Sequence, residues 1–229
     1  MVDERMIEST AKTLEGAPPQ AIVARAAHLF GSRVALACSF GGPSGMVLVD
    51  MLAGIDARVP VYYLDTGLLF AQTYALVDRV RRRYGIVPIP VTPELTVQEQ
   101  GRVFGADLWS RDPDRCCEVR KVQPQRQFLR GYLAWISGIR RDQSQGRSDV
   151  RVVEWDARFG LVKINPLARW TRDMVWSYIR AHDVPYNELH DRGYPSLGCT
   201  HCTVPVKAGE DERAGRWRGL AKTECGLHR

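Results

Sequence analysis

The sequence predicts an α/β protein built on a parallel sheet with helices on both faces. Between residues 33 and 92, short apolar or β-branched runs alternate with segments of helical periodicity, and glycine or polar clusters separate them. Strands and helices that alternate in this way form parallel sheets, because each helix connects two neighbouring strands. A hydrophobic content of 45% with 25% charged residues is typical of a chain that buries a sizeable core.

The first half of the chain predicts three strands and two helices. The apolar run 33–40 ends at a glycine cluster and predicts a buried strand, and residues 45–54 predict the helix that follows it. β-branched and aromatic residues predict a strand over 59–66, and 86–92 predicts the third strand. The helix predicted over 71–84 carries four large side chains at helical spacing: Tyr74, Val77, Val80 and Tyr84.

The second half of the chain is less regular. Residues 134–139 predict another strand of the same sheet, and 150–156 and 160–166 predict a pair of strands joined by a short turn. A helix is predicted over 171–183, starting at Thr171. Its predicted apolar side consists of Met174, Val175, Tyr178 and Ile179. From about residue 184 onwards glycine, proline and charged residues predict an irregular, loop-rich C-terminal part.

Length, hydropathy and charge limit the function classes. The 229 residues fit a single domain, 1–229, and no apolar run approaches the ~18 residues of a membrane helix. The N-terminal "MVDERMIEST" has no apolar core, so we expect no signal peptide, no membrane partner and a cytoplasmic location. The 32 basic and 26 acidic residues leave a charge of +6, which fits an anionic ligand. The sequence leaves open whether the chain forms a homo-oligomer.

The glycine-rich stretch "SFGGPSG" (39–45) follows the first predicted strand. Ligands of α/β sheets bind at the carboxyl ends of strands, where backbone N–H groups and a helix N-terminus face an anion. We therefore expect Ser39, Gly41 and Gly42 to contact a nucleotide. The stretch lacks the Walker lysine and the G-x-G-x-x-G spacing, so a plain connecting turn remains an alternative.

The stretch "LDTG" (64–67) ends the neighbouring strand and faces the same crevice. Asp65 and Thr66 are expected to hydrogen-bond a ribose or an adenine edge there. The alternative is that one of them satisfies backbone N–H groups at the start of the next helix.

Six cysteines in a cytoplasmic protein indicate metal binding or catalysis rather than disulfides. "RCCEVRK" places Cys116 beside Cys117, and "GCTHC" places Cys199 and Cys202 at C-x-x-C spacing. Four thiols from two segments match the ligand count of a zinc site or an iron–sulfur cluster. Adjacent cysteines favour the cluster, because paired zinc ligands are normally two to four residues apart. Zinc and a redox dithiol remain alternatives.

The two other cysteines differ in their surroundings. Cys38 lies in an apolar strand and is expected to be an inert core thiol. His201 lies between two ligand candidates, but four sulfurs complete the site, so we expect it to be exposed or beside the ligands. Cys225, in "TECGLHR", is left as a candidate nucleophile. We predict that residues 218–229 form a mobile tail that carries it between a substrate and a second protein. The alternative is a frayed end with an incidental cysteine.

Seven motifs occur together between about residue 30 and the C-terminus: "SFGG", "LDTG", "CCEVRKV", "WISGIRRDQS", "PYNELHDRGYPSLGCTHC", "ERAGRW" and "ECGLH". With them the chain resembles the assimilatory adenylylsulfate (APS) reductases, the iron–sulfur branch of the sulfonucleotide reductase family. The double cysteine, the C-x-x-C pair and the terminal ECGLH make the resemblance specific.

The resemblance implies a fold, a cofactor and a reaction. The fold is that of the adenine nucleotide α-hydrolases, and the cofactor is a [4Fe–4S] cluster on Cys116, Cys117, Cys199 and Cys202. The reaction reduces APS to sulfite and AMP in two steps, as part of sulfate assimilation and cysteine biosynthesis. Cys225 takes the sulfonate as S-sulfocysteine, and thioredoxin then releases sulfite. The further substrate contacts that it implies are Leu64, Gly67, Lys121, Gly138, Arg213, Arg216 and His228.

Two stretches depart from the family pattern. The nucleotide loop usually continues with acidic residues, whereas here Gly42 is followed by Pro43, Ser44 and Gly45. The family reads Ser-Pro-Gly-Thr-Arg after "RRDQ", whereas this chain reads "SQGRSD", so the candidate contact Arg147 comes one position early. The loop also lacks the Lys-Asp pair of ATP-hydrolysing relatives, which argues against ATP.

Two alternative functions stay open. One is reduction of 3′-phosphoadenylyl sulfate (PAPS), alone or together with APS, on the same scaffold. The cysteine set favours APS, because PAPS-specific relatives generally lack it. The other is a nucleic-acid-binding or tRNA-modifying protein built around a four-cysteine metal site, although we expect no nucleic-acid partner.

Overall fold

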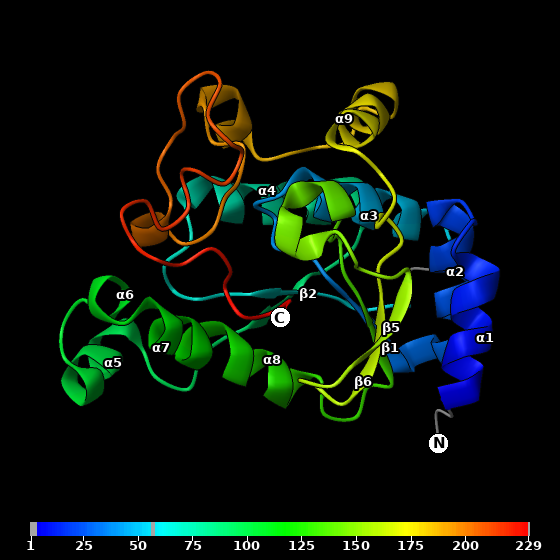
Figure 1. Ribbon diagram of the computed structural model, residues 1–229, viewed down its shortest axis with the longest axis horizontal. Helices are drawn as coiled ribbons and strands as arrows, with labels where there is room; N and C mark the ends of the chain where they lie inside the picture. The colour runs from blue at the N-terminus through cyan, green and yellow to red at the C-terminus, as the bar shows by residue number, and fades with distance from the viewer. Residues whose placement is uncertain (1–3, 56–57, 229) are drawn as a thin grey trace.

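The computed structural model describes residues 4–55 and 58–228 and contains a six-stranded sheet (Figure 1). The strands are β1 (Val34–Ala37), β2 (Val61–Leu64), β3 (Ile89–Val91), β4 (Ala134–Ile136), β5 (Val153–Asp156) and β6 (Leu161–Ile164). Their order across the sheet is β3-β2-β1-β4-β6-β5, and every neighbouring pair is parallel except β5 and β6. The predicted parallel sheet is confirmed, and the predicted strand pair forms a hairpin that adds an antiparallel edge strand.

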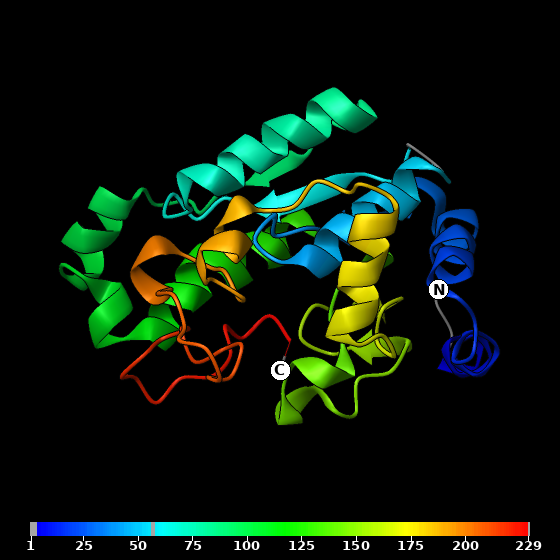
Figure 2. The ribbon, with the colours of Figure 1, turned by 90° about the horizontal axis from the view of Figure 1, so that it is seen from above.

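Helices flank the sheet and extend beyond it. They are α1 (Glu4–Leu14), α2 (Pro19–Phe30), α3 (Pro43–Ala53), α4 (Ala71–Tyr84), α5 (Val97–Phe104), α6 (Leu108–Arg111), α7 (Pro113–Cys117), α8 (Gln123–Phe128) and α9 (Arg172–Ala181). No element had been predicted for residues 4–30 and 97–128, which supply α1, α2 and α5–α8. Viewed from above, α1 and α2 lie at one end of the molecule and α5–α7 at the other (Figure 2). None of the helices in 4–55 and 58–228 combines the length and hydropathy needed to cross a bilayer.

Two hydrophobic cores lie on opposite faces of the sheet. The larger core takes alternate strand residues such as Val34 and Leu36 together with side chains from α2, α3, α4 and α9. The smaller core takes the residues in between, including Tyr62 and Trp135, and buries them against Leu129 at the end of α8. Alternation along each strand sends successive side chains to opposite faces. The expected covering of both faces by helices is therefore confirmed.

The helix predicted from Thr171 is confirmed as α9. The Thr171 side chain accepts a hydrogen bond from the Met174 backbone N–H at 3.3 Å, as an N-cap residue does. Val175 and Ile179 are buried, whereas Met174 is 45% exposed. Including Met174 on the apolar side was wrong, because α9 packs against α3 through the line of Val175 and Ile179, and Met174 lies outside that line.

The loop-rich C-terminal part is confirmed as well. Beyond α9, the regular segments of the described chain are two 3₁₀ turns, η5 (Glu188–Arg192) and η6 (Thr200–Cys202). The last described residues run between these loops and helices α7 and α8 towards the sheet (Figure 1). Residue 229, the end of the predicted tail, lies outside the described residues.

Candidate functional site

A cavity of about 250 Å³ opens at the carboxyl ends of β1, β2 and β4. Most of the predicted site residues line it: Ser39, Gly41, Gly42, Leu64, Thr66, Lys121, Gly138, Arg147, Arg213, Arg216, Cys225 and His228. Its lining does not include Asp65, Gly67 or the four predicted ligand cysteines. The fold thus brings together side chains from the nucleotide loop, the helix after the double cysteine, and the C-terminal segment.

The loop between β1 and α3 is held by close backbone packing. A Cβ atom on Gly138 would lie 3.1 Å from the Gly45 backbone nitrogen and 3.2 Å from the Ser44 Cβ. A side chain at position 138 would therefore push the end of β4 away from the start of α3. Glycine at this position lets the two strand ends and the helix N-terminus form one surface.

The 3₁₀ turn η5 fixes the same loop from the other side. His190 donates a hydrogen bond from Nε2 to the Gly41 carbonyl at 2.9 Å, and Asn187 donates to the Phe40 carbonyl at 3.1 Å. Burial lowers the pKa of His190 and outweighs the carbonyl bond, so the neutral ring is favoured. The side chains of η5 thereby hold the loop backbone in place.

The two polar residues after β2, Asp65 and Thr66, make different contacts. Asp65 accepts hydrogen bonds from the Gly67 N–H at 3.0 Å and from the Tyr74 hydroxyl at 2.7 Å, and so closes a turn before α4. The alternative of a cap on the next helix was wrong, because the N-cap residue of α4 is Phe70 and no side chain of the described chain caps it. Thr66 is buried, and its hydroxyl lies 3.3 Å from the Cys199 sulfur. Thr66 therefore connects the cavity to the cysteine site.

The double cysteine lies in a helical run with an irregular centre. α7 ends at Cys117, a π-helical turn (η2) covers Glu118–Val122, and α8 follows. Pro124 has no N–H to donate to the carbonyl of Arg120, so regular α-helical bonding cannot continue through this point. π-helical turns of this kind are frequent at functional sites. Cys116 and Cys117 are both buried at the end of α7.

The four predicted ligand thiols converge from the two segments. Burial, and after it the neighbouring charges of Cys117, Cys199 and Cys202, raises the pKa of Cys116 to about 12. Burial, and after it the charges of Cys199 and Cys117, also raises the pKa of Cys202. All six cysteines are free thiols. Within the described chain, no three His, Cys, Asp or Glu side chains are close enough to hold a single metal ion. The thiols of Cys117, Cys199 and Cys202 all act on the pKa of Cys116, so the four sulfurs lie near one another.

Lys121 lies between this cysteine site and the cavity. It is buried, which alone would lower its pKa, but the thiols of Cys199, Cys117 and Cys225 raise the pKa above its ordinary value. A buried cation with three sulfur neighbours stays protonated and lends positive charge to both sites.

Cys225 has a different environment from the other thiols. Burial raises its pKa, but Lys121, the Leu227 backbone N–H and Arg216 lower it further than burial raises it. The net result is a pKa below the ordinary value, which favours the reactive thiolate. Cys38, by contrast, is buried in the larger core and has its pKa raised to about 12 by burial, so its expected role as a core thiol is confirmed.

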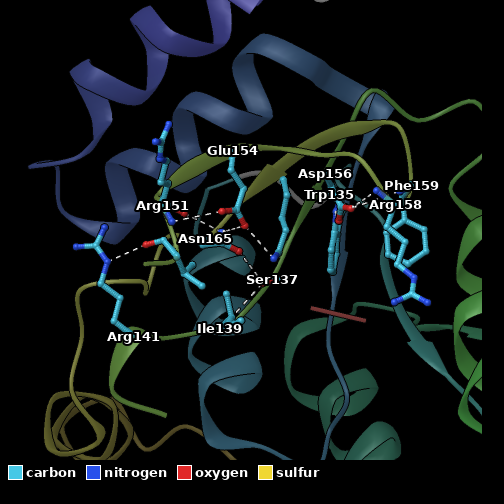
Figure 3. Close-up of polar contacts among 12 residues, drawn as sticks. Trp135, Ser137, Ile139, Arg141, Arg151, Glu154, Asp156, Arg158, Phe159 and Asn165 are labelled. Atoms are coloured by element: carbon cyan, nitrogen blue, oxygen red, sulfur yellow. Dashed lines mark hydrogen bonds and ion pairs between the residues drawn. The ribbon is translucent and has the colours of Figure 1, made fainter. Parts of the chain in front are cut away.

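The end of the tail is docked on the sheet. The His228 ring stacks on Trp135 with centroids 5.7 Å apart and planes 9° apart. Figure 3 shows how the platform is fixed: the Trp135 indole donates to Asp156 at 3.1 Å, and Asp156 also accepts from the Arg158 backbone N–H. Burial, together with the charges of Lys163, Arg147 and Arg213, lowers the pKa of His228 well below its ordinary value. These contacts describe one docked position, and the mobility of residues 218–229 stays a prediction.

Three residues that contact the tail or lie in it were not among the predicted site residues. Trp135 and Glu224 lie in quoted motifs but were given no role, and Arg158 lies in the turn between β5 and β6 with no motif to mark it. Trp135 contacts His228 from β4, Arg158 contacts Gly226 from the hairpin, and Glu224 pairs with Arg147 of η4. His201 is exposed, as predicted, and stacks on Trp109 at 4.1 Å.

Comparison with solved structures places the fold. The phosphoadenylyl-sulfate reductase of Candida auris, solved as a phosphate complex, superposes with a TM-score of 0.78 over 89% of this chain and 98% of that one, at 31% identity. The FMN adenylyltransferase of Candida glabrata superposes with a TM-score of 0.58 over 96% and 74% of the two chains, at 15% identity, which is a likeness of fold alone. The expected adenine nucleotide α-hydrolase-like architecture is confirmed.

The sequence defines the family. Residues 33–205 match the phosphoadenosine phosphosulfate reductase domain, and the chain belongs to this family. A protein of Gloeobacter violaceus named phosphoadenosine 5′-phosphosulfate reductase is 47% identical over 99% of this chain and 95% of its own length. Adenosine 5′-phosphosulfate reductase 2 of Bacillus subtilis is 50% identical over 87% and 84%. The resemblance to the sulfonucleotide reductases is thereby confirmed.

Proposed function

We propose that this protein reduces APS to sulfite and AMP in sulfate assimilation, with reduced thioredoxin as the electron donor in the cytoplasm. Relatives named for APS reduction at 46–50% identity over 87–92% of the chain support the substrate. The observation that carries the proposal is that Cys225, a thiol with a lowered pKa, lines the same cavity as the nucleotide loop and Lys121.

The first step transfers the sulfonate to the protein. The Cys225 thiolate attacks the sulfur of APS, an S–S bond forms, and the O–S bond to the phosphate breaks. AMP leaves with the electron pair of that bond, and Cys225 becomes S-sulfocysteine. A thiolate is the form of cysteine that attacks sulfur, and the lowered pKa of Cys225 increases its fraction at neutral pH.

The second step needs an external dithiol. One thioredoxin thiolate attacks the Cys225 sulfur, which releases sulfite and leaves a mixed disulfide. The second thiol of thioredoxin breaks that disulfide, so thioredoxin is oxidised and Cys225 is regenerated. We propose that residues 218–229 leave the cavity for this step, because a sulfur inside the cavity is out of reach of another protein.

The remaining cavity residues are proposed substrate contacts. The cations Lys121, Arg213 and Arg216, with His228, are proposed to hold the sulfate and phosphate oxygens. The nucleoside part is proposed to contact Ser39, Gly41, Gly42, Leu64, Thr66 and Gly138. Arg147 also lines this cavity. Asp65 and Gly67 are proposed to act by shaping the strand-end turn, since Asp65 accepts the Gly67 N–H.

The buried cysteine site fits an iron–sulfur cluster by the chemistry of its donors. Cys116, Cys117, Cys199 and Cys202 supply four thiols from two segments, and the charges of the other three act on the pKa of Cys116. We propose that these four residues hold a [4Fe–4S] cluster. When bound, the cluster would add negative charge beside Lys121 and so influence the electrostatics of the cavity. Thr66, with its hydroxyl 3.3 Å from the Cys199 sulfur, would orient one ligand.

Reduction of PAPS is the second candidate, because the Gloeobacter relative that matches 99% of this chain carries that name. Steady-state kinetics of sulfite release, with reduced thioredoxin and each nucleotide in turn, test both candidates. We expect a higher kcat/KM for APS. An equal or higher kcat/KM for PAPS would overturn the assignment, and no sulfite from either nucleotide would overturn the proposed function.

The metal content tests the binding-module alternative. The reductase is expected to be brown, with broad absorption near ~400 nm and about four irons per chain. A colourless protein with one zinc per chain would support a nucleic-acid-binding module instead. Iron assay and absorption spectroscopy of the protein purified without oxygen make the measurement.

A further inference from the structure

Glu224, the residue before Cys225, is gripped by two arginines. The Arg147 guanidinium forms a fork with its carboxylate, with Nε 2.9 Å from one oxygen and Nη2 2.6 Å from the other. The Arg213 Nη2 lies 3.1 Å from the second oxygen and also donates to the Thr223 carbonyl at 2.6 Å. Bidentate pairs of this kind are the strongest and most directional ion pairs in proteins.

The ion pair is shielded from water. The side chains of Arg147, Glu224 and Arg213 are 9%, 17% and 17% exposed. Arg147 is itself fixed, because Gln143 accepts from it and from the Arg140 backbone N–H. Surface ion pairs contribute little, but a shielded fork on an anchored arginine holds its partner in one place.

A further arginine holds the chain on the other side of Cys225. Arg158 donates to the Gly226 carbonyl and to Glu118, at 3.2 Å from the carboxylate. Gly226 has a φ of 86°, which turns the chain towards Trp135 and which glycine adopts without strain. Cys225 is thus held between two arginine contacts, and Arg158 also reaches the residue that follows Cys117.

We propose that Glu224 is a positioning residue whose carboxylate latches the tail to Arg147 and Arg213, so that Cys225 is presented to the cavity. The inference rests on the proposed sulfonate transfer and adds the device that aligns its nucleophile. It assigns Arg147 to the tail rather than to the substrate. Arg147 lies in the stretch where this sequence departs from the family pattern, one position earlier than the family's arginine. From the 3₁₀ turn η4 (Gln145–Arg147) its side chain reaches Glu224.

A role for Glu224 as a general base fits the contacts poorly. Both of its oxygens accept hydrogen bonds from arginines, so neither oxygen is directed at the Cys225 thiol. The cysteine also has cations of its own in Lys121 and Arg216. The carboxylate fixes the position of the backbone at 224 and 225. Its charge also raises the pKa of Cys225, so Arg147→Gln, which leaves that charge in place, is the variant that reports on position alone.

The test measures how often Cys225 leaves the cavity. The holoenzyme without nucleotide is treated with iodoacetamide, and mass spectrometry follows alkylation of the C-terminal peptide. Cys225 is the one cysteine in that peptide, so its alkylation is measured separately from that of the other thiols. We expect Glu224→Gln and Arg147→Gln each to speed alkylation about tenfold, since each removes a charge-assisted hydrogen-bonded pair. The double variant is expected to be no faster than either single variant, because the two residues act as one unit.

Glu188→Gln is the matched control. It makes the same change of charge in an exposed pair with Arg192, at 3.0 Å and away from the tail, and should leave the alkylation rate unchanged. With APS present, Glu224→Gln is expected to form the sulfonate adduct about tenfold more slowly at low substrate, and Glu224→Asp to recover part of the rate.

The outcomes separate the latch from the reaction. Unchanged alkylation in Glu224→Gln, or additive effects in the double variant, would overturn the latch. A wild-type enzyme that takes up no sulfonate would overturn the proposed function, while its alkylation rates would still report on the latch. A thermal midpoint of Glu224→Gln equal to that of the wild type would show that the fold is intact; a fall with uniform alkylation of all cysteines would indicate general unfolding and overturn the proposal.

Discussion

The molecule holds its sulfur atoms in two different ways. Cys116 and Cys117 lie at the end of a helix that continues through a π-helical turn, and burial raises the pKa of both. Cys225 lies on a segment without helix or strand, held by arginine contacts and one stacked ring, and its pKa is lowered. One region is fixed by regular backbone bonding and packing, and the other by a few polar side chains.

The difference matches the work proposed for each region. Thiols that hold a cofactor need fixed positions. A helix packed among buried side chains fixes Cys116 and Cys117, and their proposed role requires no movement. A nucleophile that meets both a nucleotide and a second protein needs a hold that can be released. Polar contacts at the ends of long side chains break without unfolding anything else. The sheet, by contrast, provides the rigid edge against which the tail docks.

Replacing the nucleophile is the strongest way to test the contrast. Cys225→Ser is expected to abolish sulfite release, by at least about 10³-fold, because a hydroxyl is a far weaker nucleophile towards sulfur at neutral pH. The iron content and absorption near ~400 nm should remain those of the wild type. Normal turnover by this variant would contradict the account, as would loss of iron.

Removing a ligand thiol should have the complementary result. Cys199→Ala is expected to lose most of the iron and the colour, since Cys199 is one of four proposed ligands, while Cys225 should remain open to alkylation. Metal analysis and peptide mass spectrometry make the comparison. Full iron retention would show that the ligand set is wrong.

The charge of Lys121 sharpens the contrast between the two kinds of thiol. In the wild type the pKa of Cys225 is lowered, so the thiolate is present above that pKa and the alkylation rate falls as the pH drops through it. Lys121→Gln removes a cation that lowers this pKa, so the curve of rate against pH should move to higher pH. The rate at neutral pH should fall about tenfold. An unmoved curve would mean that Lys121 does not act on Cys225.

His190, which holds the loop after β1, should make the stability of the fold depend on pH. Burial lowers the folded-state pKa of His190, so the unfolded chain binds more protons below the ordinary value. The free energy of unfolding should therefore fall as the pH drops through about 6.5, by at most about 1.4 kcal/mol per pH unit for this group. Urea midpoints of the wild type and His190→Gln at several pH values test this, and an equal pH slope in both would contradict it.

The smallest expected effect is on the stability of the fold and leaves the tail unchanged. Thr171→Ala removes the N-cap of α9, where the threonine side chain accepts the Met174 N–H, and should cost about 1 kcal/mol of stability. Urea unfolding measures the cost. The alkylation rate of Cys225 should not change, because α9 does not hold the tail. A faster rate would show that the stability of α9 and the position of the tail are coupled.

Periodicity and motif spacing were sufficient to predict the sheet, α3, α4 and α9. They did not predict α5–α8, whose short helices carry no long apolar stripe and depend on the cysteine site and the loops for their packing. Most of the cavity residues could be predicted from the motifs that carry them. The contacts of Arg158 and Trp135 with the tail could not, because Arg158 in the hairpin and Trp135 in β4 are far from the chain end in sequence and meet it only in the folded protein.

In the proposed reaction Cys225 alone accepts the sulfonate, while the four proposed ligand thiols do not. Mixing the reduced holoenzyme with APS, without thioredoxin, and mapping the peptides by mass spectrometry tests it most directly. We expect one added SO₃ group per chain, on the peptide that contains Cys225, and its loss when reduced thioredoxin is added. An adduct on any other cysteine, or no adduct in a preparation that still releases sulfite, would contradict it.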